Sequence, residues 1–212
     1  MVYFLLFKDT WKIINWISAF EGMSNRGTLL QEKLKSMDET KQLQPPLTEA
    51  DVRSLEAGEQ VLITGTVYTA RDMAHKRLCE SIDAGRELPF ELEGAIIYFV
   101  GPTPARPGRV IGAAGPTTSS RMDAFSPKLI AKGLRAMIGK GYRGVEVREA
   151  LKEYGAVHLT TIGGAGSLLS KHIVASEVIA YDDLGAEAIR KLSVVDFPAV
   201  VAYDAYGNSV YK

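Results

Sequence analysis

"GAIIYFVG", residues 94–101, is a continuous apolar run with a glycine at each end. Runs of this kind are typical of strands that are buried on both faces of a sheet. The β-branched run at 60–69 predicts a second strand, and the glycine inside it, Gly65, predicts a bulge. Residues 70–85, between these strands, repeat apolar side chains at helical spacing, with Thr69 in the position of an N-cap. A strand, a helix and a buried strand in succession indicate an α/β fold.

Farther from this run, strands and helices continue to alternate. Thr48 and Asp51 are spaced like a capping box and predict a helix over 47–55. Further helices are predicted over 126–139, 145–155, 166–174 and 185–194, strands over 109–115, 156–163 and 175–183, and a hairpin over 198–211. Several pairs of consecutive strands have no helix between them. We therefore expect an α/β fold with a mixed sheet and some antiparallel pairing.

The composition excludes several classes of protein. The chain has 212 residues with 25 basic and 25 acidic side chains, and 46% of its residues are hydrophobic, which excludes a disordered chain. The zero net charge argues against nucleic acid as the main partner, and no apolar stretch is long enough to span a membrane. The single cysteine, Cys79, excludes an intrachain disulfide and a cysteine-rich metal site. We expect a cytoplasmic protein that holds no metal itself.

The first 45 residues differ in pattern from the rest. Residues 4–20 place apolar side chains on one helix face, with charged residues interleaved. A helix that docks on its own domain or on a partner is favoured over an interfacial membrane helix, which would carry more Lys and Arg. The polar stretch that follows ends in Pro45-Pro46 and is typical of a linker with a short helix. We divide the chain into an N-terminal helical extension with linker, 1–45, and a folded domain, 46–212.

The sequence "GPTTSSRMD", residues 115–123, places four consecutive hydroxyl side chains directly before Arg121. Clusters of Gly, Pro, Ser and Thr are common in loops, so a plain loop would account for the composition. Hydroxyls and backbone N–H groups around an arginine fork would also fit a carboxylate or a phosphate. The residues alone leave both interpretations open.

Arg71 falls in the first turn of the helix predicted over 70–85, where a cation opposes the helix dipole. A surface salt bridge would explain it. A bound anion would explain it better, because the helix N-terminus attracts the same anion. His75 lies one turn later on the same face, so it could share a site with Arg71 or could be an ordinary core or surface histidine.

Other polar residues have simpler interpretations. Lys140 lies between two glycines just past the predicted end of a helix, where capping and ligand binding are equally compatible with the pattern. His158 and His172 have no partners at metal-ligand spacing, so we expect structural roles for both. The stretch at 163–169 lacks the full spacing of a dinucleotide loop, and tight strand–helix packing is the better interpretation.

Three longer segments carry a resemblance to a known family: residues 64–78, 98–141 and 195–208. Together they closely resemble the β-subunit, or C-terminal region, of the class I iron–sulfur hydro-lyases, which are the oxygen-sensitive fumarases and the L-tartrate dehydratases. The resemblance runs from about residue 46 to residue 212 and does not include the first 45 residues. It implies a "swivelling" β/β/α domain, which is compatible with the mixed sheet expected above.

The resemblance also implies a partner. In this family a separate α-subunit, or N-terminal region, holds a [4Fe–4S] cluster through three cysteines and leaves one iron open for substrate. This chain has one cysteine, so it cannot hold that cluster alone. We expect a heteromer with an α-subunit that carries the cluster cysteines, with two copies of each subunit.

Residue roles carry over where the motifs match. Arg71, in the T-x-R-D motif, resembles the arginine that holds one substrate carboxylate, and Arg121 resembles the arginine for the second. Thr117 resembles the threonine proposed to move the proton on C3, and Lys140, in GKG, resembles a substrate-binding lysine. His75, Thr118 and Asp123 are expected next to these residues.

The resemblance supports three functional hypotheses. The leading one is the β-subunit of a class I fumarate hydratase, which interconverts (S)-malate and fumarate together with its α-subunit and is inactive alone. The second is the β-subunit of an L(+)-tartrate dehydratase, because a four-carbon dicarboxylate fits the same pair of arginines. The third is a dicarboxylate-binding or assembly module without catalytic activity.

Overall fold

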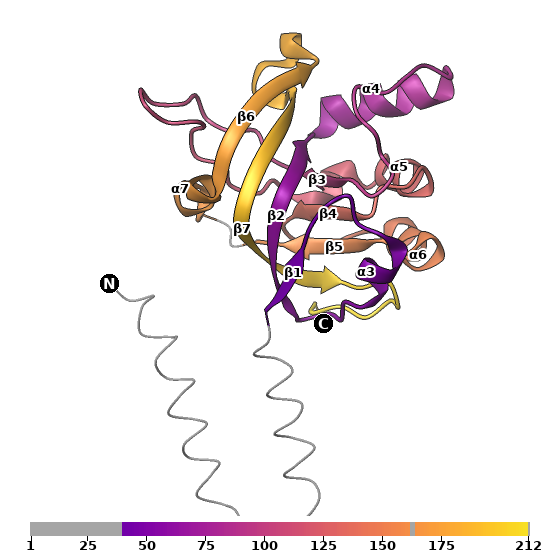
Figure 1. The fold of residues 1–212 in the computed structure, drawn as a ribbon. Coiled ribbons are helices and arrows are strands. Elements are labelled where there is room, and N and C mark those ends of the chain that lie inside the picture. Colours follow the sequence, from indigo (N-terminus) through magenta and orange to yellow (C-terminus); the bar gives the residue numbers. More distant parts are fainter. Residues whose placement is uncertain (1–39, 162–163, 212) are drawn as a thin grey trace, which may run out of the picture. The chain divides into compact units, whose positions relative to one another are not determined.

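The computed structural model describes residues 40–161 and 164–211, which form an α/β fold around one mixed sheet (Figure 1). The strand order is β1-β2-β3-β4-β5-β7-β6. The strands are β1 (Lys41–Leu43), β2 (Gln60–Thr69), β3 (Ile96–Tyr98), β4 (Ala136–Gly139), β5 (Val157–Thr160), β6 (Ile173–Ala180) and β7 (Ile189–Tyr203). The helix expected over 4–20 lies outside the described residues.

The sheet closes on itself because β7 has two neighbours far apart in the strand order. Strands β1 to β5 pair in parallel. Strand β7 runs antiparallel to β5 and β6, and it also pairs along most of β2. Strands β2, β3, β4, β5 and β7 therefore form a closed, barrel-like arrangement. The register of β2 against β7 shifts between Ile63 and Gly65, which confirms the predicted bulge.

Short helices connect the strands. They are α3 (Glu49–Arg53), α4 (Asp72–Asp83), α5 (Ser126–Ala131), α6 (Val145–Tyr154) and α7 (Gly166–Leu169), with 3₁₀ turns η2 (Ser119–Met122), η3 (Ser170–His172) and η4 (Asp182–Glu187). The predicted capping box is present at the start of α3, where Thr48 and Asp51 bond to each other's backbone N–H groups. Helix α6 ends at Gly155, whose left-handed conformation at φ 63° stops the helix.

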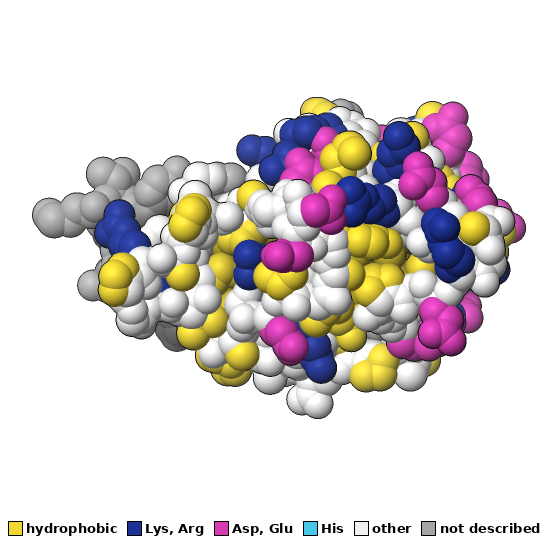
Figure 2. Space-filling model, turned by 90° about the horizontal axis from the view of Figure 1, so that it is seen from above, with side chains coloured by type: hydrophobic (Ala, Val, Ile, Leu, Met, Phe, Trp, Pro, Cys, Tyr) yellow, Lys and Arg dark blue, Asp and Glu magenta, His cyan; other side chains and the backbone are white. Residues whose placement is uncertain are grey.

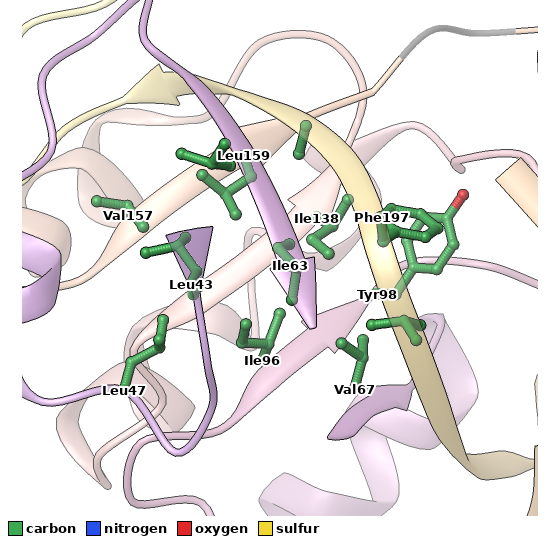
Figure 3. Close-up of a cluster of buried hydrophobic side chains, with 14 of the residues drawn as sticks. Leu43, Leu47, Ile63, Val67, Ile96, Tyr98, Ile138, Val157, Leu159 and Phe197 are labelled. Atoms are coloured by element: carbon green, nitrogen blue, oxygen red, sulfur yellow. The ribbon is translucent and has the colours of Figure 1, made fainter. Parts of the chain in front are cut away.

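Two apolar cores lie on the two sides of the strands. One core contains side chains from the β-strands, including Ile63, Tyr98, Ile138 and Phe197 (Figure 3). The second contains side chains of α4, α5 and α6 together with the other face of β3 and β4. Strand β3 is buried on both faces, as the apolar run at 94–101 predicts, and β4 is buried on both faces as well.

Two predicted elements in the middle of the chain are different in the structure. Residues 109–115 are irregular rather than a strand, although Val110 and Ile111 favoured one. The helix predicted over 126–139 ends at Ala131, and residues 136–139 form β4. Gly133 adopts φ 100°, which ends the helix, and the apolar AMIG segment then inserts between β3 and β5.

The largest error concerns the region predicted as a helix over 185–194. Residues 182–187 form η4, and β7 begins at Ile189 and continues to Tyr203. Ala, Glu, Arg, Lys and Leu favour helix locally, but pairing with both β2 and β6 overrides that preference. The segment 166–174 is helical only to His172, after which β6 begins.

Strand β1 lies within the segment predicted as a linker. Residues 41–43 pair in parallel with Val61, Leu62 and Ile63 of β2, and Leu43 is buried. The sheet therefore begins before Pro45-Pro46, while the division of the chain at residue 45 stays a prediction.

Candidate functional site

The carboxyl ends of three neighbouring parallel strands carry the predicted site residues. Arg71 follows β2, Gly101 follows β3, and Lys140 follows β4 directly. The hydroxyl-rich segment continues this edge: Thr117 N–H donates to the Phe99 carbonyl at 2.7 Å. Ligands of α/β sheets bind outside the carboxyl ends of the strands, so this edge is the expected place for a site.

The hydroxyl run is tied to β4 at Thr117, Thr118 and Ser119, and its last two residues begin η2. The Lys140 N–H donates to the Thr117 carbonyl at 3.2 Å, and the Ser119 N–H donates to the Lys140 carbonyl at 2.8 Å. Thr118 and Lys140 are therefore bridged in parallel, and the Lys140 side chain is exposed. The prediction that Lys140 follows a helix is wrong, because the preceding residues form β4.

Arg71 is held at the start of α4. It occupies the N-cap position, and the prediction of Thr69 as N-cap is wrong. Thr69 is the last residue of β2, and its hydroxyl donates to the Ala188 carbonyl at 3.2 Å and accepts from the Arg190 N–H at 2.9 Å. The Arg71 guanidinium lies so close to Gly101 that a Cβ atom at this glycine would be 2.8 Å from Nη1.

Both predicted arginines already contact a carboxylate. Arg71 Nη2 lies 3.2 Å from Glu187 Oε1, and Arg121, at the end of the hydroxyl run, pairs with Asp72. The salt-bridge interpretation of Arg71 is thus correct in part. A guanidinium has five N–H donors, so each arginine can still bind an anion. The Nε of Arg71 and the Oδ1 of Asp72 are buried and have no hydrogen-bond partner among the described residues.

His75 contacts the backbone of Arg71 rather than its guanidinium. Its Nδ1 lies 3.0 Å from the Arg71 carbonyl, and because a carbonyl only accepts, Nδ1 carries the proton. Complete burial lowers the pKa of His75 to about 4. The neutral ring packs edge-on against Phe99, so His75 supports the start of α4 from inside the core.

A buried arginine that the sequence analysis missed lies beneath the hydroxyl run. The Arg143 side chain is 0% exposed, and its Nε donates to Asp123 Oδ1 at 2.7 Å. Nη2 donates to Ser126 Oγ at 2.6 Å, and Nη1 lies 3.2 Å from His158 Nδ1. Asp123 Oδ2 also accepts from the Gly144 N–H at 2.7 Å. Every charged atom of this pair is thereby hydrogen-bonded.

The network fixes the tautomer of His158. Arginine can only donate, so Nδ1 of His158 accepts and Nε2 donates to Ser119 Oγ, 3.1 Å away. Burial and the nearby Arg143 charge both lower the pKa of His158 well below its ordinary value, which keeps the ring neutral. His158 is structural, as expected, and it holds Ser119 in the middle of the hydroxyl run.

Asp123 therefore orients Arg143 and the end of the hydroxyl run. No signal in the sequence marked Arg143, because the surrounding residues GYRG are typical of an exposed turn. Only the fold shows that this guanidinium is buried, over the ring of Phe99.

The described residues contain one cysteine. Cys79 is buried in α4, and its thiol lies 3.7 Å from the Phe125 carbonyl. Within 40–161 and 164–211, no group of three His, Cys, Asp or Glu side chains is arranged to hold a metal ion. Over the same residues, no helix is long and apolar enough to cross a membrane.

Comparison with known proteins gives the family of this chain. The family described as "Fumarase C-terminus" matches residues 19–212, which includes part of the predicted N-terminal extension. The chain belongs to this family. Its relatives include a putative class I fumarate hydratase of Geobacillus stearothermophilus, 37% identical over 96% of this chain, and the anaerobic class I fumarate hydratase of Escherichia coli, 35% identical over 93%. The family assignment from the three sequence segments is confirmed.

The relatives differ in length. This chain spans 41% of the Geobacillus protein and 37% of the E. coli protein. It spans 88% of the putative L(+)-tartrate dehydratase subunit beta of Methanocaldococcus jannaschii, to which it is 37% identical over 78% of its own length. The chain is thus a β-subunit or C-terminal region of a hydro-lyase family, and the roles of its individual residues stay predictions.

Proposed function

We propose that this chain is the β-subunit of a class I fumarate hydratase and contributes the dicarboxylate-binding half of the active site. The observation that carries the proposal is the placement of Arg71, Thr117, Arg121 and Lys140 at one edge of the sheet. Two of the three cations at this edge pair with carboxylates, Arg71 with Glu187 and Arg121 with Asp72, and Lys140 adds a further positive charge for a dianionic substrate. The proposal also includes the fold type, a swivelling β/β/α domain, and a location in the cytoplasm.

In this proposal the two arginines hold the two ends of the substrate. Arg71 binds one carboxylate with the donors that Glu187 leaves free, and Arg121 binds the other. Losing the C3 proton builds negative charge on the adjacent carboxylate, and a guanidinium fork stabilises that charge. The ion pairs with Glu187 and Asp72 keep the two guanidiniums in place before substrate arrives.

Thr117 is the proposed carrier of the C3 proton. Its backbone is fixed on both sides, to Phe99 and to Lys140, and its side chain is partly exposed at the strand ends. A hydroxyl is a weak base, so a neighbouring cation has to stabilise its deprotonated form. Lys140 is the proposed cation, because its backbone bonds directly to that of Thr117.

The rest of the reaction requires a partner. The described residues offer one buried thiol, which does not fit a cluster, so we assign the [4Fe–4S] cluster to an α-subunit in an α2β2 assembly. The cluster would supply the Lewis acid for departure of the C2 hydroxyl. This chain would be inactive alone.

One observation favours a second candidate, the β-subunit of an L(+)-tartrate dehydratase. The relative with that printed name is 37% identical to this chain, which equals the identity of the Geobacillus fumarate hydratase. The fixed arginines fit either four-carbon dicarboxylate.

An anaerobic assay tests the proposal. The full chain is measured alone, then with its candidate cysteine-bearing partner after cluster reconstitution, with malate and tartrate in parallel. We expect no turnover by the chain alone and malate turnover by the mixture. Faster tartrate turnover would select the dehydratase. A formed complex with an intact cluster and no turnover of either substrate would contradict both assignments and favour a binding module.

A further inference from the structure

One cavity is lined by residues other than the proposed dicarboxylate-binding ones. It has a volume of about 280 Å³ and lies between the loop at 103–113 and the α7–η3 segment. Its polar lining consists of three cations and three hydroxyl side chains: Arg106, Arg109, Lys171, Thr103, Ser167 and Ser170. Arg71, Thr117, Arg121 and Lys140 are not among its lining residues.

The walls of this cavity are held in place by backbone contacts. Thr103 N–H donates to the Ala113 carbonyl at 3.1 Å, and Ala113 N–H donates to Thr103 Oγ1 at 2.8 Å. Gly112 approaches Thr103 so closely that a Cβ atom would lie 2.2 Å from its carbonyl oxygen. The loop is joined to α7 by the bond from the Ala114 N–H to the Gly166 carbonyl, at 3.0 Å. These backbone bonds therefore fix the walls of the cavity relative to each other.

A tight turn brings two of the cations together. Arg109 N–H donates to the Arg106 carbonyl at 3.0 Å, and Gly108 adopts φ 74°. Proline followed by glycine at the two central positions is the signature of a type II turn, in which the first and fourth Cα atoms lie within about 7 Å. Arg106 and Arg109 occupy those two positions, and Lys171 faces the cavity from η3.

These three cations lack the carboxylate partners that ten other basic side chains of the described residues have. On the face that Figure 2 shows, basic and acidic side chains lie close to one another. Arg71 and Arg121 each pair with a carboxylate. Among the described residues, none of Arg106, Arg109 and Lys171 forms an ion pair. Three like charges around one cavity repel one another, and a bound anion would relieve that repulsion.

We propose that this cavity is a second anion site and binds a small phosphate polyanion, a di- or triphosphate group. Two guanidinium forks match the oxygens of adjacent phosphates, and Lys171 adds a third positive charge. The Ser167 hydroxyl can donate a further hydrogen bond. A four-carbon dicarboxylate carries only two negative charges, so it matches this cavity less well than a diphosphate does.

The test is isothermal titration calorimetry of the full chain with inorganic pyrophosphate at constant ionic strength. We expect saturable binding of one pyrophosphate per chain. The double variant R106A/R109A should bind at least about tenfold more weakly. The matched control is R86A/R148A, which removes the same charge from two exposed arginines that form no ion pair among the described residues. Its affinity should stay within about twofold of the wild type.

Two further titrations separate this site from the proposed dicarboxylate site. Arg121→Ala should bind pyrophosphate like the wild type, and succinate should not displace pyrophosphate. Equal weakening in both double variants would show general charge attraction and overturn the proposal. So would the absence of saturable binding, a loss of binding in Arg121→Ala, or displacement by equimolar succinate. None of these results depends on activity, so they are independent of the hydro-lyase assignment.

Discussion

Replacing His75 by asparagine should reduce the loss in the free energy of unfolding that acid causes. His75 is fully buried, its Nδ1–H donates to the Arg71 carbonyl, and its pKa is about 4 against an ordinary value of 6.5. The folded state therefore keeps this ring neutral at a pH where the unfolded chain protonates it. Asparagine can place an N–H near the Nδ1 position and does not titrate.

The sign and the magnitude follow from proton linkage. Below pH 6.5 the unfolded state binds more protons at His75 than the folded state does. The contribution of the neutral His75 ring to the free energy of unfolding is therefore complete above pH 6.5 and is lost as the pH falls toward 4. Between pH 7 and pH 5 the two pKa values give a loss of about 2 kcal/mol from His75 alone. Other groups add their own pH dependence, and these are shared by the wild type and the variant.

Urea unfolding at pH 7 and pH 5 measures this difference. Each protein is compared with itself, so the packing defect caused by the smaller side chain cancels. The wild type should lose about 2 kcal/mol more than His75→Asn between the two pH values. His172→Asn is the matched control: that ring also contacts a backbone carbonyl, of Val195, but is partly exposed, and the variant should follow the wild type. Equal losses in the wild type and His75→Asn would refute the assignment of a buried, neutral His75.

Three other substitutions test the site. Gly101→Ala should push the Arg71 guanidinium aside, because the new Cβ would lie 2.8 Å from Nη1 and 3.2 Å from the Ala186 carbonyl oxygen. The kcat/KM of the assembled enzyme should fall by roughly tenfold or more, and an unchanged kcat/KM would remove Arg71 from the site. Arg121→Lys removes the paired guanidinium donors and should lower kcat/KM by roughly 10²-fold, whereas the control Arg148→Lys should leave it unchanged. Near-normal steady-state kinetics of Arg121→Lys would contradict the role of Arg121 in binding a substrate carboxylate. Arg143→Ala leaves Asp123 without its charged partner and should lower the free energy of unfolding by about 3 kcal/mol. Calorimetry should show a fall in Tm of about 6 °C or more, and an unchanged Tm would contradict the network.

Local patterns predicted much of the fold. The apolar run at 94–101 and the β-branched run at 60–69 did correspond to neighbouring strands, and the bulge at Gly65 is present. Long-range pairing was not predictable in the same way. Residues 189–194 have helix-favouring composition, and they are a strand only because β2 and β6 lie on either side.

The residues of the candidate site also differ in whether a local pattern marks them. Glycines, hydroxyls and arginines in short motifs marked Arg71, Thr117, Arg121 and Lys140, because ligand-binding residues cluster in strand-end loops with recognisable composition. Arg143 was missed, since burial of a guanidinium depends on which distant groups surround it. Its partners lie 15 to 20 residues away along the chain, at His158, Ser126 and Asp123, and no local pattern links them.

The double pairing of β7 has a consequence for how the chain reaches its native state. The edge of β2 that faces β7 is left open until residues 189–203 have been synthesised, more than a hundred residues after β2 itself. Ring closure thus depends on contacts between distant parts of the sequence, which makes folding slow compared with helical proteins of similar size. During translation the unpaired edge of β2 offers its N–H and C=O groups to any other nascent chain. A ribosome that stalls before residue 189 would therefore release an aggregation-prone intermediate, and chaperone demand for this protein should be concentrated in that interval.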